Sequence, residues 1–111
     1  MAKLTRTYSR QNREAVELLA EMIRAGRIER KITTRDMAVR AGVSRTLLQR
    51  IEKGDPGCAI GAVFEVAVLA GVLLFETEPE RLQIHRAALK DKLSLLPRRI
   101  RKPARVIHDE F

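Results

Sequence analysis

Four polar side chains between residues 45 and 50 have the types and spacing needed to read the edges of DNA base pairs: Arg45, Thr46, Gln49 and Arg50. Side chains three or four apart lie on one side of an α-helix, so these four would form a strip along it. Arginine donates to guanine O6 and N7, and glutamine pairs with adenine. The chemistry predicted here is hydrogen bonding to bases. No Ser-His-Asp set, carboxylate pair, metal cluster or Gly-rich phosphate loop suggests an enzyme.

Two short helices joined by a tight turn over residues 33–54 would position this strip. Thr33 or Thr34 could cap the first helix, because a hydroxyl there accepts from an unpaired backbone N–H. Gly42 fits the left-handed residue that ends a helix. Ser44 then fits the cap of the second helix.

The apolar residues of the second helix indicate which side faces the core. Leu48 and Ile51 are three apart and are expected to point inward. Leu47 does not fit that spacing and is expected at the rim, near sugar or a thymine methyl. Two helices in this arrangement typically present the second one to the DNA major groove.

Phosphate contacts are expected where helices begin and end. Backbone N–H groups at a helix start and nearby cations attract anions and fix the register of a protein on a duplex. The residues expected to do this are Thr34, Arg35, Ser44, Lys53 and Ala59 through its backbone.

The segment TTRDMAVRAGVSRTLLQRIEKG resembles the XRE/Cro-type regulators, and the resemblance covers about residues 16–72. It implies an all-α, compact, five-helix lambda-repressor-like domain. The base-reading positions of the family fall on Arg45, Thr46 and Arg50, with Gln49 beside them. Thr34 matches a position usually held by Gln, which favours a phosphate contact there over a base contact.

The same family often ties its first helix to the end of its recognition helix by an Arg–Glu pair. Arg27 and Glu52 match those two positions. The alternative is that both side chains are simply solvated, as most surface charges are.

Charge is distributed unevenly along the 111 residues, whose formal net charge is +8. Residues 1–57 hold 13 Lys/Arg against 7 Asp/Glu, residues 58–95 hold 4 against 5, and residues 96–111 hold 5 against 2. Basic ends around a near-neutral middle fit a phosphate-facing front and a partner-facing back. Aromatic residues are too few for a platform that stacks single-stranded bases.

Cys58 is the only cysteine, so no disulfide can form within the chain, which fits a cytoplasmic protein. We expect Cys58 to be a small buried hydrophobe. His85 and His108 lack ligand-like spacing, so no metal site and no cofactor are expected. The apolar stretch 58–75 is interrupted by Glu65 near its centre and is not expected to span a membrane.

Three further helices are expected. The first covers residues 9–30 with Ser9 as its cap, and the fourth covers 59–70. The fifth runs from Pro79 to about Leu95. The fourth has almost no polar residue, which suggests cover on more than one side, by the fifth helix and a second subunit; a buried helix of a monomer is the alternative.

Residues 1–96 are expected to form the domain for DNA binding and dimerisation, and 97–111 a flexible or strand-forming tail. The tail could follow DNA phosphates or the minor groove, dock on a protein partner or the other subunit, or remain a disordered solubilising segment. Its candidate contact residues are Arg98, Arg99, Arg101, Lys102 and Arg105.

The stretch IEKGDPGCAIGAVFEVAVLAG, the leucine-rich segment after it and the tail RRIRKPARVIHDEF resemble the HipB-like antitoxins encoded beside HipA-type kinases. The basic run of the tail is not shared by every member. The resemblance implies a homodimer that represses its own operon at a double-stranded DNA operator and holds a HipA-like kinase toxin. Alternatives are a stand-alone XRE-type repressor without a toxin, and an interaction module that has lost DNA binding.

Overall fold

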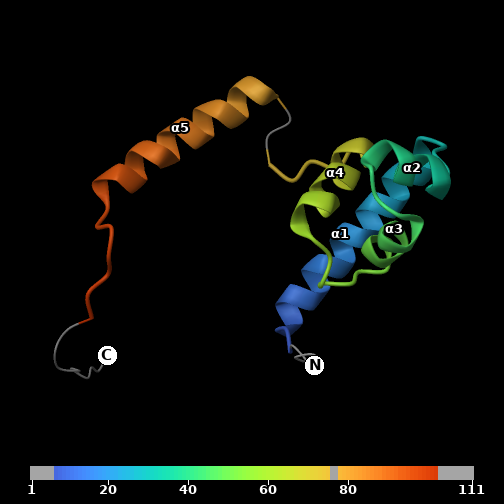
Figure 1. Ribbon diagram of the computed structural model, residues 1–111, viewed down its shortest axis with the longest axis horizontal. Helices are drawn as coiled ribbons and strands as arrows, with labels where there is room; N and C mark the ends of the chain where they lie inside the picture. The colour runs from blue at the N-terminus through green and yellow to red at the C-terminus, as the bar shows by residue number, and fades with distance from the viewer. Residues whose placement is uncertain (1–6, 76–77, 103–111) are drawn as a thin grey trace. The chain divides into compact units, whose positions relative to one another are not determined.

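The residues that the structure describes contain five helices (Figure 1). The computed structural model describes residues 7–75 and 78–102, and those ranges contain no strand. The helices are α1 (Arg10–Glu29), α2 (Thr34–Ala41), α3 (Arg45–Glu52), α4 (Ile60–Ala70) and α5 (Pro79–Leu95). The predicted all-α fold of five helices is therefore confirmed, and every helix lies within one or two residues of its expected position.

The chain divides into two units, Met1–Leu74 and Phe75–Phe111. Every buried residue in the described part of the chain falls between Ala20 and Val72, so the hydrophobic core belongs to the first unit. Its largest fully buried side chains are Ile23, Met37, Leu48 and Val66. The functional boundary expected at residue 96 stays a prediction.

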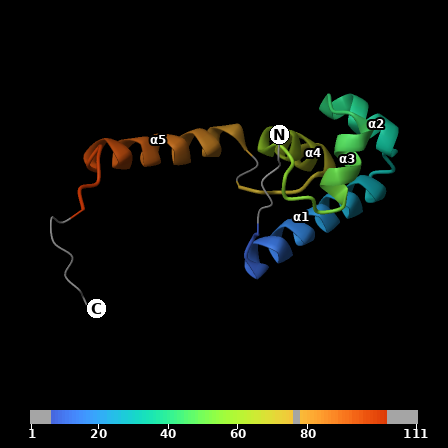
Figure 2. The same cartoon turned by 60° about the horizontal axis from the view of Figure 1, so that its bottom comes forward.

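Helix α1 is the longest element, with 20 residues, and it contacts both α3 and α4. The Ser9 hydroxyl accepts from the Asn12 N–H at 3.1 Å and caps the helix as expected. The buried residues of α1 lie in its C-terminal half, from Ala20 to Arg27. Helices α2, α3 and α4 gather around that half, and the first turns of α1 extend past them (Figures 1 and 2).

Gly26 lets α1 and α4 approach closely. A Cβ built on Gly26 would overlap the backbone carbonyl of Ala70, so only glycine fits this crossing. Arg30 Nη1 donates to the same Ala70 carbonyl at 2.9 Å. Gly71 follows with φ 79° and ends α4 in the left-handed conformation.

Helix α4 packs against both α1 and α2. Val66, Ala67 and Ala70 are buried there, whereas Ile60 and Val68 are 72% and 67% exposed. One side of α4 therefore contributes to the core and another side presents apolar surface. The additional cover expected from a second subunit stays a prediction.

Helix α5 begins with Pro79 at its first position and ends at Leu95, as the sequence predicts. None of its residues is buried, although Leu82, Leu89 and Leu93 lie along it. Among the described residues, no helix has the length and apolar character needed to cross a bilayer.

Candidate nucleic-acid interface

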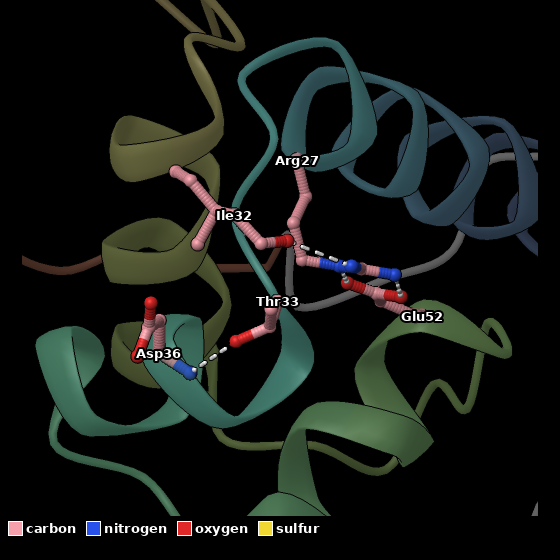
Figure 3. Close-up of polar contacts among 5 residues, drawn as sticks. All are labelled: Arg27, Ile32, Thr33, Asp36 and Glu52. Carbon is pink, nitrogen blue, oxygen red and sulfur yellow. Dashed lines mark hydrogen bonds and ion pairs between the residues drawn. The ribbon is translucent and has the colours of Figure 1, made fainter.

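The two helices of the predicted motif begin at side-chain caps. The Thr33 hydroxyl accepts from the Asp36 N–H at 3.0 Å, so Thr33 is the cap of α2 and Thr34 is its first residue (Figure 3). The Ser44 hydroxyl accepts from the Leu47 N–H at 3.0 Å and caps α3. Both caps are local contacts, so they fix where each helix starts.

The turn between α2 and α3 depends on Gly42, which has φ 70° and ends α2 in the left-handed conformation. The Val43 N–H then donates to the Ala38 carbonyl at 3.0 Å, and the Val43 side chain packs against the core. This contact holds the turn against the end of α2, which sets the direction in which α3 leaves.

One side of α3 is held by the core. Leu48 is fully buried and Ile51 is 4% exposed, as predicted. Leu47 is half-buried and packs against the core, a core contact that its spacing did not predict. Its expected position at the rim, near sugar or a thymine methyl, stays a prediction. Leu47 precedes Ile51 by four residues, so it lies on the same side of the helix.

The opposite side of α3 is exposed and cationic. All four predicted base-reading side chains are exposed, and so is Lys53 at the helix end. At 100° per residue, the five positions cover an arc of about 140° that contains no buried residue. We call this set the α3 outer face: Arg45, Thr46, Gln49, Arg50 and Lys53. Its contact with bases stays a prediction.

A buried ion pair fixes the C-terminal end of α3 to α1 (Figure 3). Arg27 Nε and Nη2 donate to the two carboxylate oxygens of Glu52 at 2.7 and 3.1 Å. Arg27 Nη1 donates to the Ile32 carbonyl at 2.9 Å. The two side chains are 11% and 9% exposed, so the pair implied by the resemblance is confirmed and the solvated alternative is wrong.

The predicted phosphate-binding positions differ in accessibility. Arg35, Ser44, Lys53 and Ala59 are exposed, and Thr34 is half-buried. Ala59 precedes α4, whose first turn has no side-chain cap. The backbone N–H groups of that turn therefore retain the donor capacity that suits an anion.

Arg50 makes a contact that sequence reasoning missed. Its Nε donates to Asp55 Oδ2 at 2.8 Å, across the end of α3. The hydrogen bond to Asp55 and the charge of that carboxylate raise the pKa of Arg50 above its ordinary value. Arg50 is therefore a permanent cation with one edge of its guanidinium already engaged.

Cys58 lies in the loop that follows and is half-buried against the core, which is less burial than expected. Burial raises the pKa of the Cys58 thiol, the Asp55 charge adds to that shift, and the Arg50 charge opposes it. The thiol is therefore protonated at neutral pH and is a poor nucleophile.

Arg24 is a second residue that sequence reasoning missed. It lines an open hollow together with Gln49, Glu52 and Lys53, which brings a cation of α1 beside the α3 outer face. Its signal in the sequence is its spacing: Arg24 precedes Arg27 by three residues and therefore shares a side of α1 with it.

The tail is described only in part. Its candidate contact residues Arg98, Arg99, Arg101 and Lys102 are exposed and lie outside any helix. Arg105 lies outside the described residues. In the ranges 7–75 and 78–102, no group of His, Cys, Asp and Glu side chains could hold a metal ion.

The fold and this site define an all-helical protein in which α2, a tight turn and α3 present a cationic face. No protein-family model matches the chain, and no curated protein matches it significantly.

Proposed function

We propose that the protein is a sequence-specific repressor that binds double-stranded DNA with α3 in the major groove. The observation that carries the proposal is the division of α3 into two sides. Leu47, Leu48 and Ile51 attach one side to the core, and the α3 outer face keeps two arginines, a threonine, a glutamine and a lysine in solvent. Arginine and glutamine are the side chains that read guanine and adenine in the major groove.

Electrostatics support the same assignment. The formal net charge of +8 would draw the protein to DNA and release counterions from the phosphates. Arg35, Lys53, the Ser44 hydroxyl and the backbone N–H groups near Ala59 are the proposed phosphate contacts. Such contacts fix the position of the protein on the duplex, while the arginines supply sequence preference.

Homodimerisation is the second part of the proposal. A single 17-residue helix is only marginally stable in water, and α5 has no buried residue of its own. Its exposed leucines and the apolar surface of α4 support pairing of two copies through the region from Phe64 to Leu96. A two-fold dimer of this kind would place its recognition helices about 34 Å apart, on successive major grooves.

Arg45→Ala is expected to weaken binding to the cognate duplex by about 1–3 kcal/mol and to relax the preference at one base pair. The measurement is fluorescence anisotropy with the promoter of the operon that encodes the chain. Arg10→Ala, which removes an arginine that is 85% exposed at the start of α1, is the control and should leave the base preference unchanged. Unchanged binding by Arg45→Ala would show that the α3 outer face does not read bases.

The partner proposed for the dimer is a HipA-like kinase toxin, which would make the protein a cytoplasmic antitoxin that regulates its own operon. The support is the resemblance of residues 51–71 and of the C-terminal segment to HipB-like antitoxins. Co-purification from the native operon should yield a kinase-sized companion in stoichiometric amount. A dimer that binds the promoter but retains no companion would instead be a stand-alone repressor.

A further inference from the structure

The carboxylate of Asp55 has both oxygens engaged in fixed positions. Oδ1 accepts from the Gly57 N–H at 2.8 Å, and Oδ2 accepts from Arg50 Nε at 2.8 Å. The Asp55 N–H also donates to the Arg50 carbonyl at 3.0 Å. The loop that leaves α3 thus holds Arg50 through its backbone and through its side chain at once.

This contact decides which edge of the Arg50 guanidinium is available. A guanidinium is a planar fork of five donors. Asp55 engages the donor on Nε, which leaves the paired Nη1 and Nη2 groups for another acceptor. The Arg50 side chain is 48% exposed, so the ion pair leaves about half of it accessible to solvent. Two parallel N–H donors match the O6 and N7 acceptors of guanine.

Gly57 leaves room for this arrangement. A Cβ built on Gly57 would lie 3.2 Å from Asp55 Oδ1 and 3.7 Å from Arg50 Nη2. The first distance is tight for a carbon atom, so a side chain at this position would press on the carboxylate that orients Arg50. The absence of a side chain at Gly57 therefore leaves the space that the Asp55 carboxylate occupies beside Arg50.

We propose that Asp55 is a positioning residue that sets the base preference of Arg50. By holding Nε, it directs the Nη1 and Nη2 donors toward guanine and lowers the entropy that Arg50 loses on binding. Its negative charge also repels phosphates and so weakens non-specific attachment. Both effects raise the ratio of specific to non-specific affinity. The inference rests on the proposed function, since it concerns how α3 would read DNA.

The test uses the full chain and a pool of duplexes of about 30 base pairs with a randomised centre, long enough for two half-sites one helical turn apart. Selection with the wild-type protein gives the preferred sequence, and selection with Arg50→Ala identifies the base pair that Arg50 reads. In Asp55→Asn, guanine preference at that base pair should fall about tenfold, within the range that one bidentate contact supplies. Affinity for a scrambled duplex should stay equal or increase.

Three further variants test whether a loss of guanine preference comes from the lost contact between Asp55 and Arg50, from the loss of a negative charge, or from misfolding. Asp36→Asn removes a carboxylate from α2 and should leave the guanine preference intact. Asp55→Ser keeps an oxygen that can accept from the Gly57 N–H but cannot pair with Arg50, so it should lose the preference as Asp55→Asn does. Asp55→Asn added to Arg50→Ala should cause no further loss, because the two residues act through one contact.

The inference is overturned if Asp55→Asn and Asp55→Ser keep the guanine preference, or if they weaken all base pairs equally. In that case the wild-type protein still selects a sequence and the proposed function stands. If the wild-type protein enriches no sequence at all, the proposed function itself fails, and the positioning role fails with it.

Discussion

Replacing Glu52 by alanine is expected to lower the free energy of unfolding by about 3–5 kcal/mol. The variant leaves the Arg27 charge with the Ile32 carbonyl as an acceptor but without its counterion, at a site where Arg27 is 9% exposed. An uncompensated buried charge is costly because the core cannot replace the water that would solvate it. Urea denaturation followed by circular dichroism should show a lower midpoint with an unchanged slope.

The exposed pair Arg10–Glu14 provides the matched control. Its side chains are 85% and 65% exposed, so Glu14→Ala should change the free energy of unfolding by less than about 0.5 kcal/mol. The double variant Arg27→Met with Glu52→Leu should recover most of the loss, because it removes both charges and leaves apolar volume. A cost for Glu52→Ala no larger than that of Glu14→Ala would contradict the importance assigned to the buried pair.

Ending the chain after Phe75 is expected to preserve folding and to weaken binding to a duplex with two half-sites by about 100- to 10,000-fold. The fragment retains every buried residue of the described chain, so it should still melt cooperatively. The fragment lacks α5, so each copy would bind its half-site independently. It would not gain the affinity that comes from being linked to a second subunit on the neighbouring half-site. Anisotropy on duplexes with one and two half-sites measures this difference, and sedimentation measures the dimer.

A chain ending at Leu96 is the control for this truncation, because it retains α5 and removes only residues 97–111. It should remain dimeric. A loss of salt-dependent affinity in this variant would assign the tail to DNA, and a loss of kinase retention would assign it to the toxin. If the fragment ending at Phe75 is itself a dimer of full affinity, the pairing surface lies within the first unit instead.

Local patterns predicted the start and end of each helix well. The caps Ser9, Thr33 and Ser44 could be recognised because each hydroxyl bonds a backbone N–H only three residues away. The exposure of the base-reading candidates followed from the same helical period. The core contact of Leu47 was missed because α3 has only eight residues, and Leu48 and Ile51 alone do not define the width of its buried side.

Contacts between distant residues required more than periodicity. No pattern in the sequence indicated that Gly26 lies against Ala70, because the two residues meet only when α1 and α4 cross. The ion pair between Arg50 and Asp55 was also missed, although Asp55 follows Arg50 by only five residues. The chain turns at Gly54, where φ is 81°, so helical spacing rules no longer apply beyond that point.

Apolar patterning indicated that α4 contributes to a core but could not indicate which of its apolar side chains stay exposed. Val66 and Ala67 are buried in the first unit, whereas Val68 on the same helix is 67% exposed. A sequence shows which residues are apolar, but it does not show which other surface packs against them.

The side chains that anchor α3 and those that face outward are different residues, with no position shared between them. Substitutions on the outward side can therefore alter recognition while the packing that supports the helix stays intact. Under the proposed function, the unit offers a scaffold for engineered variants with new operator preferences, in which Arg45, Thr46 and Gln49 are randomised as a library. Asp55 would be retained wherever Arg50 is retained, so that the two residues are exchanged as one module.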